Sequence, residues 1–156
     1  MFKKEVYINR RRELANSVKS GLLLFLGNSE VGFNYPSNTY TFRQDSSFLY
    51  FFGLDEPDLA AVIDAESGEE IIFGNDVTMD DVIWIGPQPK MSDKAALAGV
   101  TKVMAADSLE EYLKRAVKSG RNIHFLPPYR DANKIFLNSV LGIPFSEMKA
   151  RASVEF

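Results

Sequence analysis

Residues 42–57 read FRQDSSFLYFFGLDEP, a stretch that combines a helix start, an aromatic run and a helix stop. The carboxylate of Asp45 can accept a backbone N–H at the first turn of a short helix, which Gly53 would end. A strand is the rival interpretation, because aromatic residues also favour strands. Arg43 could pair with a buried carboxylate and hold the loop against a sheet. We therefore interpret Arg43 and Asp45 as residues that shape the fold rather than bind substrate.

The residues on either side of this stretch predict a helix and three strands. Apolar residues recur at helical spacing over Glu5–Val18, and the apolar run Leu22–Leu26 that follows is typical of a strand buried on both faces. Turn-forming residues fill 27–41, which we expect to be a loop. After the motif, Leu59–Asp64 and Glu70–Phe73 predict a hairpin.

The second half of the chain continues the alternation of helices and strands. Ser108 and Glu111 predict a capping box at the start of one helix, and Ile135, Phe136 and Val140 should face inward from another. Taken together, the elements predict an α/β fold with a mixed β-sheet flanked by helices. The expected elements are a short strand or an excursion at Val82–Ile85, a strand at Lys102–Ala105, a helix at Leu109–Lys118, a strand at Asn122–Leu126 and a helix at Asp131–Leu141.

Length and composition restrict the class of protein. The 156 residues fit one domain, and 46% hydrophobic residues can supply its core. The net charge of −3 gives no reason to expect nucleic acid binding. The chain has no cysteine, and no apolar run approaches the ~20 residues of a membrane span. We expect a cytoplasmic protein with neither nucleic acid nor membrane as a partner.

No residue set in the sequence assembles a catalytic or metal site. His124 is the only histidine, and its place in a strand pattern favours a structural role. Asp76, Asp80 and Asp81 lack the regular ligand spacing of a cation loop, so a solvated loop is the better interpretation. The three arginines 10–12 point in different directions on a helix and are expected to be solvated. We predict no catalytic and no metal-binding residue in this chain.

The motif at 42–57 closely resembles one in the N-terminal domain of Xaa-Pro aminopeptidases, the aminopeptidase P family of creatinase and prolidase-type metallopeptidases. Further matches to that family are Arg10–Leu14, Ile83–Pro87 and Leu97–Val100. The resemblance covers almost the whole chain. It implies a parent enzyme, a hydrolase that removes the N-terminal residue preceding a proline.

The resemblance also implies a larger C-terminal catalytic domain that this chain lacks. In the family that domain holds a dinuclear metal centre, commonly manganese, so no cofactor is expected in these 156 residues. We expect residues 1–144 to be the N-terminal domain and 145–156 to begin the linker to its catalytic partner. The chain would then be a cut piece or a natural fragment, inactive by itself.

The family's N-terminal domain helps to form homo-oligomers and shapes the approach to the active site, where peptides with proline at the second position bind. Trp84 matches the position of an aromatic that takes part in this contact. The alternative is that Trp84 packs on its own domain. Two further functions stay open: the N-terminal domain of a prolidase-type dipeptidase, or a stand-alone protein-interaction module.

Overall fold

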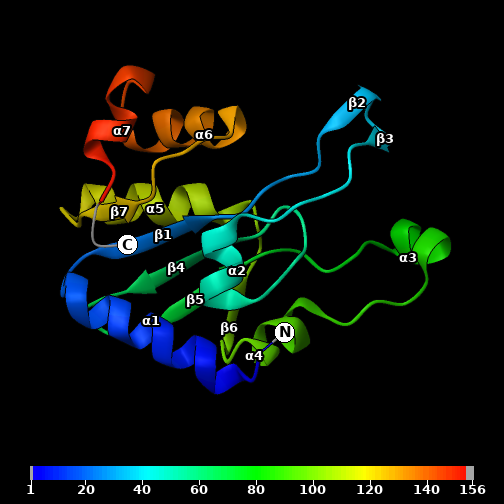
Figure 1. Cartoon of the computed structure of the whole chain (residues 1–156), viewed down its shortest axis with the longest axis horizontal. Coiled ribbons are helices and arrows are strands. Elements are labelled where there is room, and N and C mark those ends of the chain that lie inside the picture. Colours follow the sequence, from blue (N-terminus) through cyan, green and yellow to red (C-terminus); the bar gives the residue numbers. More distant parts are fainter. Residues whose placement is uncertain (1, 154–156) are drawn as a thin grey trace.

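A computed structural model describes residues 2–153, except for the side chain of Asp81, and it centres on a five-stranded sheet (Figure 1). The strand order is β6-β5-β4-β1-β7. The pairs β1/β4 and β4/β5 are antiparallel, whereas β1/β7 and β5/β6 are parallel. The strands are β1 (Leu22–Leu26), β4 (Ala60–Asp64), β5 (Glu70–Phe73), β6 (Lys102–Met104) and β7 (Ile123–Phe125), and a separate hairpin holds β2 (Gly32–Tyr35) and β3 (Asn38–Thr39).

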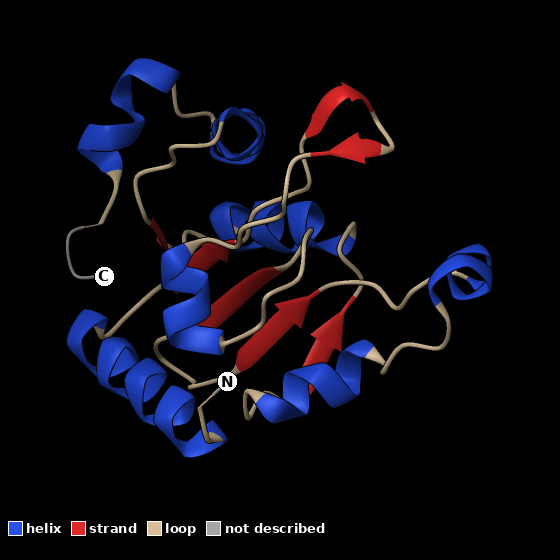
Figure 2. Ribbon diagram, turned by 45° about the vertical axis from the view of Figure 1, so that its right-hand side comes forward, coloured by secondary structure: helices blue, strands red, loops and turns tan. Residues whose placement is uncertain are grey.

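Helices cover both faces of the sheet, as Figures 1 and 2 show. One face carries α1, α2 and α4, and the other carries α5, α6 and α7. The predicted α/β fold with a mixed sheet is therefore confirmed. The helices are α1 (Lys4–Val18), α2 (Ser46–Phe52), α3 (Met79–Ile85), α4 (Met91–Leu97), α5 (Ser108–Lys118), α6 (Asp131–Leu141), the 3-10 helix η1 (Phe145–Glu147) and α7 (Met148–Arg151).

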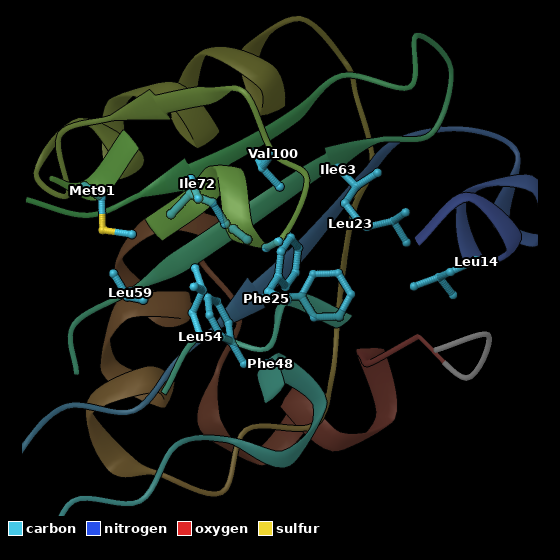
Figure 3. Close-up of a cluster of buried hydrophobic side chains, with 14 of the residues drawn as sticks. Leu14, Leu23, Phe25, Phe48, Leu54, Leu59, Ile63, Ile72, Met91 and Val100 are labelled. Carbon is cyan, nitrogen blue, oxygen red and sulfur yellow. The ribbon is translucent and has the colours of Figure 1, made fainter. Parts of the chain in front are cut away.

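Each face of the sheet has its own apolar core, because successive strand residues point to opposite sides. Leu23 and Phe25 of β1 join the core under α1 and α2 (Figure 3), while Leu22 and Leu24 join the core under α5 and α6. The continuous apolar run of β1 is thus explained by burial on both faces, as predicted. The hairpin β4–β5 and the helix at Asp131–Leu141 are likewise confirmed.

Four local expectations were wrong in whole or in part. Residues 27–41 contain the β2–β3 hairpin, whose strands are exposed and short and lie among turn-forming residues. Val82–Ile85 belongs to helix α3, with Val82 N–H donating to Thr78 O and Gly86 N–H to Val82 O. The strand alternative is therefore wrong, whereas the excursion alternative agrees with the structure, because the segment lies away from the sheet (Figure 2).

The other two corrections concern side chains on α5 and α6. Ser108 donates its hydroxyl to Ala105 O and makes no capping box with Glu111, because it is already the first residue of α5. Ile135 is exposed, whereas Leu137 and Val140 are buried. Phe136 packs against the same core, so the prediction is confirmed for Phe136 and Val140 and wrong for Ile135 alone.

The tail after residue 144 packs on the same face as α5 and α6. Met148 of α7 is buried in that core, and Ser153 N–H donates to Phe125 O of β7 at 3.0 Å. Residues 145–153 therefore continue the fold up to the end of the described chain. The division of the chain at residue 144 stays a prediction.

Candidate interaction site

The motif at 42–57 is organised around the buried amide of Gln44, which the sequence analysis overlooked. Its Oε1 accepts from the backbone N–H groups of Asn28 at 2.8 Å and Asp45 at 2.9 Å. Its Nε2 donates to Glu56 O at 2.6 Å. One side chain therefore joins the loop after β1, the start of α2 and the loop before β4, which explains its burial without a charge partner.

Asp45 begins α2 in the way the sequence predicts. Its Oδ1 accepts from the N–H groups of Ser47 and Phe48, both at 2.9 Å, so the capping prediction is confirmed and the strand alternative is wrong. Gly53 ends the helix at φ 67°, and a Cβ there would lie 2.3 Å from the Tyr7 ring. Both constraints exclude a larger residue.

Arg43 does not form the ion pair that the sequence suggested. Its side chain is exposed and pairs with no carboxylate in the described part of the chain. That structural role falls instead to Arg11, whose side chain is fully buried. The expectation of a solvated 10–12 run was thus wrong for Arg11.

Arg11 connects helix α1 to three distant segments. Its Nε and Nη2 bind the two carboxylate oxygens of Glu70 at 2.9 and 2.8 Å. Two further N–H groups donate to Phe51 O at 2.8 Å and Ala98 O at 2.9 Å. The pair is bidentate and each of the three guanidinium nitrogens donates a hydrogen bond, which compensates the burial of the charge.

A group of exposed apolar side chains lies on α3. Trp84 is 86% exposed, and its neighbours Met79, Ile83 and Ile85 are exposed as well. Figures 1 and 2 show α3 at the end of an arm formed by the residues between β5 and α4, away from the sheet. The alternative that Trp84 packs on its own domain is therefore wrong.

A second exposed aromatic group lies on and beside the β2–β3 hairpin, which also extends away from the sheet (Figure 1). Phe33, Tyr35 and Tyr40 are each more than half exposed, and the rings of Phe33 and Tyr40 pack edge to face at 5.0 Å. Arg43 and Asp45 lie just after this hairpin in the chain. Trp84 lies on the separate α3 arm, so the structure does not bring it together with Arg43 or Asp45.

His124 holds the tail of the described chain against β7. Its Nε2 lies 2.9 Å from Ser20 O, and its Nδ1 lies 2.9 Å from Ser153 Oγ. Because a carbonyl only accepts, Nε2 donates to Ser20 O, and Nδ1 shares a hydrogen bond with the Ser153 hydroxyl. No carboxylate among residues 2–153 orients this imidazole, so the contacts support the predicted structural role.

Metal-ligand side chains do not gather anywhere in the described residues. No three of His, Asp or Glu between residues 2 and 153, leaving aside the side chain of Asp81, could hold a metal ion together. Asp76 accepts from Met91 N–H at the start of α4, which gives it a structural partner. The residues present here do not fit a dinuclear centre. Within the same part of the chain, the helices are too short or too polar to cross a membrane.

The sequence matches the family model described as "Aminopeptidase P, N-terminal domain" over residues 7–124. The chain belongs to the aminopeptidase P N-terminal domain family. The match extends from α1 to β7 and contains the motif, the hairpin and the α3 arm. The resemblance recognised in the sequence is confirmed.

Curated relatives of this aminopeptidase P-type domain are much longer than the chain. The mitochondrial intermediate cleaving peptidase 55 of Arabidopsis thaliana is 30% identical over 103 residues, which cover 66% of this chain and 20% of that protein. A probable Xaa-Pro aminopeptidase of Chaetomium globosum is 29% identical over 108 residues, 69% of this chain and 18% of that protein. The chain thus spans about a fifth of the length of these relatives.

Solved structures share the fold of this aminopeptidase P-type domain. Aminopeptidase P from Escherichia coli in its low-pH form superposes with a TM-score of 0.75 at 22% identity, over 91% of this chain and 33% of that one. The same enzyme with the inhibitor Pro-Leu gives a TM-score of 0.71 at 20% identity, over 88% and 32% of the two chains. At this identity the likeness establishes the fold alone.

Proposed function

We propose that this chain is the non-catalytic N-terminal domain of a metal-dependent Xaa-Pro aminopeptidase and that its α3 arm contributes to oligomerisation and to access to the active site. The proposal is supported by the family, by the names of the relatives and by the short share of their length that the chain covers. The main observation in favour of a contact role for the arm is that Trp84 is 86% exposed.

An arm of this kind suits a contact outside its own domain. Four large apolar side chains on a seven-residue helix stay in water, although burying each would contribute about 1.5–3 kcal/mol. A tryptophan offers a wide, rigid surface, and such residues often dominate the energy of an interface. We infer that these side chains pack against the partner subunit or the catalytic domain.

The chemistry of peptide hydrolysis lies outside the described residues in this proposal. A dinuclear manganese centre, when bound in the catalytic domain, would supply an activated water. No residue of this chain is assigned to that centre, since the described residues bring no three metal-ligand side chains together. The purified 156-residue chain should therefore not hydrolyse Xaa-Pro peptides at any manganese concentration. Metal-dependent turnover by the chain alone would refute this division of labour.

Replacing Trp84 by alanine tests the role of the arm. In the full-length parent, Trp84→Ala should raise KM or loosen the oligomer, measured by steady-state kinetics and analytical ultracentrifugation. In the 156-residue chain it should leave the melting temperature unchanged, because Trp84 packs on nothing there. Ile135→Ala is the matched control, since Ile135 is 61% exposed on α6, far from the arm (Figure 1). Unchanged KM and oligomer, or a large loss of domain stability, would contradict the proposal.

The reading frame beyond Phe156 distinguishes the peptidase from a stand-alone interaction module, which the exposed arm would also suit. A continuing frame that encodes two Asp, one His and two Glu at metal-binding spacing supports the peptidase. A stop codon supports the module. Activity of the parent on Xaa-Pro dipeptides alone, rather than on longer peptides, would assign it to the prolidase type. Cytoplasmic localisation stays a prediction.

A further inference from the structure

We propose that Arg43 and Arg130 form a binding site for a carboxylate attached to an apolar group, at the carboxyl ends of strands β1 and β7. Both side chains line one open hollow of about 300 Å³. Neither guanidinium makes an ion pair or a hydrogen bond to any other residue that the structure describes. This proposal does not rest on the proposed peptidase function.

The hollow lies among the loops that follow β1 and β7, on the side of the sheet where open α/β sheets bind ligands. β1 and β7 are parallel neighbours, and the chain leaves them toward opposite faces of the sheet. After β1 it passes through the hairpin to α2, which packs on one core, and after β7 it enters α6, which packs on the other. Such a divergence opens a crevice outside the carboxyl ends of the two strands.

A buried asparagine fixes the two loops that carry the arginines. Asn28 is 3% exposed, and its Nδ2 donates to Arg43 O at 2.8 Å and to the Tyr129 hydroxyl at 3.0 Å. Arg130 follows Tyr129 in the chain. Its carbonyl accepts a hydrogen bond from Lys134 N–H in α6, which fixes the backbone on the C-terminal side of Arg130. The backbone at both arginines is therefore fixed. Their guanidinium groups keep their hydrogen-bond donors available, and that of Arg130 lies over the Tyr129 ring, 5.7 Å from its centre.

The lining of the hollow indicates the chemistry of the ligand. It contains two arginines, the hydroxyl residues Ser29 and Thr41, and no acidic residue. The nearest acids in sequence, Glu30 and Asp131, are not among the lining residues, and Asp131 pairs with Lys134 at 2.9 Å. A guanidinium presents two parallel N–H groups that match a carboxylate.

The remaining walls of the hollow are apolar or aromatic and would contact the body of the ligand. They are formed by Val31, Tyr40 and Phe42, of which Tyr40 is 55% exposed. A terminal carboxylate next to an aliphatic or aromatic side chain, as at the end of a peptide, satisfies both halves of the site. Free phosphate shares the anionic chemistry but has nothing to place against the apolar wall.

Nuclear magnetic resonance of the ¹⁵N-labelled 156-residue chain tests the site. N-acetyl-leucine is the probe, N-acetyl-leucinamide is its uncharged match, and inorganic phosphate at equal ionic strength is the second anion. The carboxylate should shift the amide signals of residues 29–31, 41–43 and 130, whereas the leucinamide should not. Shifts of equal size with leucinamide, or equal or tighter binding of phosphate at the same amides, would overturn the proposal.

Two single substitutions assign the binding to the arginines. Arg43→Gln and Arg130→Gln should each weaken N-acetyl-leucine binding at least about tenfold, since each removes a charge-assisted hydrogen-bonding group. Arg12→Gln is the control, because Arg12 is exposed on α1 and outside the hollow. Equal affinity in all three variants, or an equal loss in Arg12→Gln, would refute the site. Because both arginines are exposed, the variants should keep the melting temperature of the native chain.

Discussion

Replacing Arg11 by alanine should remove the polar connection between α1 and the sheet. The substitution breaks the bidentate pair with Glu70 and leaves the carbonyls of Phe51 and Ala98 without their donor. It also removes a guanidinium that lies 5.0 Å from the centre of the Phe52 ring. The loss therefore includes hydrogen bonds, an ion pair and packing at one position.

The magnitude follows from the burial of the two partners. Breaking a buried ion pair by removing one member costs about 3–5 kcal/mol, because the other charge remains without compensation. The Glu70 side chain is 20% exposed, so water can restore part of its solvation. We therefore expect the low end, about 3 kcal/mol, which for a chain of this size lowers Tm by about 6–12 °C.

Thermal and urea unfolding of the 156-residue chain, followed by circular dichroism, measure this effect. Arg12→Ala is the control, because Arg12 is the next residue of the same helix but is exposed. Its free energy of unfolding should change by no more than about 0.5 kcal/mol. If Arg11→Ala destabilises the chain no more than Arg12→Ala does, the buried pair does not stabilise α1 and the reasoning is wrong.

Three more substitutions test the motif and the sheet. Asp45→Ala should lower the free energy of unfolding by about 1 kcal/mol in urea melts, because it leaves two N–H groups of α2 without their acceptor. Gln44→Leu should cost about 2–3 kcal/mol in the same assay, since three backbone groups lose a buried partner. The hydrogen-bonded guanidinium of Arg121 holds the pKa of Asp64 well below its ordinary 3.8, so their pair stabilises the fold above that pH and less as the pH falls below it. Asp64→Asn should therefore cost about 1–2 kcal/mol at pH 7 and flatten the decline of stability measured below pH 3.8.

Local signals were sufficient to predict much of the fold. Three elements show their signal within their own residues, either as a hydrophobic pattern or as turn-forming residues. They are the strand Leu22–Leu26, the hairpin β4–β5 and the helix Asp131–Leu141. The Asp45 cap is equally local, because its acceptor and donors lie within three residues. Interactions of this range can be read from a short window of sequence.

Long-range partners could not be predicted in the same way. Arg11 looks like its arginine neighbours, and only Glu70, which lies 59 residues away, distinguishes it. Gln44 binds three backbone groups, and because every residue type has a backbone, the sequence does not reveal these partners. Val31, Phe33 and Tyr35 alternate with Gly32 and Asn34, which is a strand pattern, but the many turn-forming residues around them favoured a loop. Trp84 is exposed because the α3 arm extends away from the sheet. The amino-acid composition of the arm does not determine that position.

The most direct test of the interaction role of the α3 arm is the accessibility of Trp84, the only tryptophan of the chain. Acrylamide quenching of its fluorescence should be nearly as efficient in the 156-residue chain as for free tryptophan. In the full-length parent, with any other tryptophans replaced by phenylalanine, Trp84 should be shielded and its emission shifted to the blue. Equal quenching in the two proteins would show that the arm contacts neither the catalytic domain nor another subunit, and would contradict the proposal.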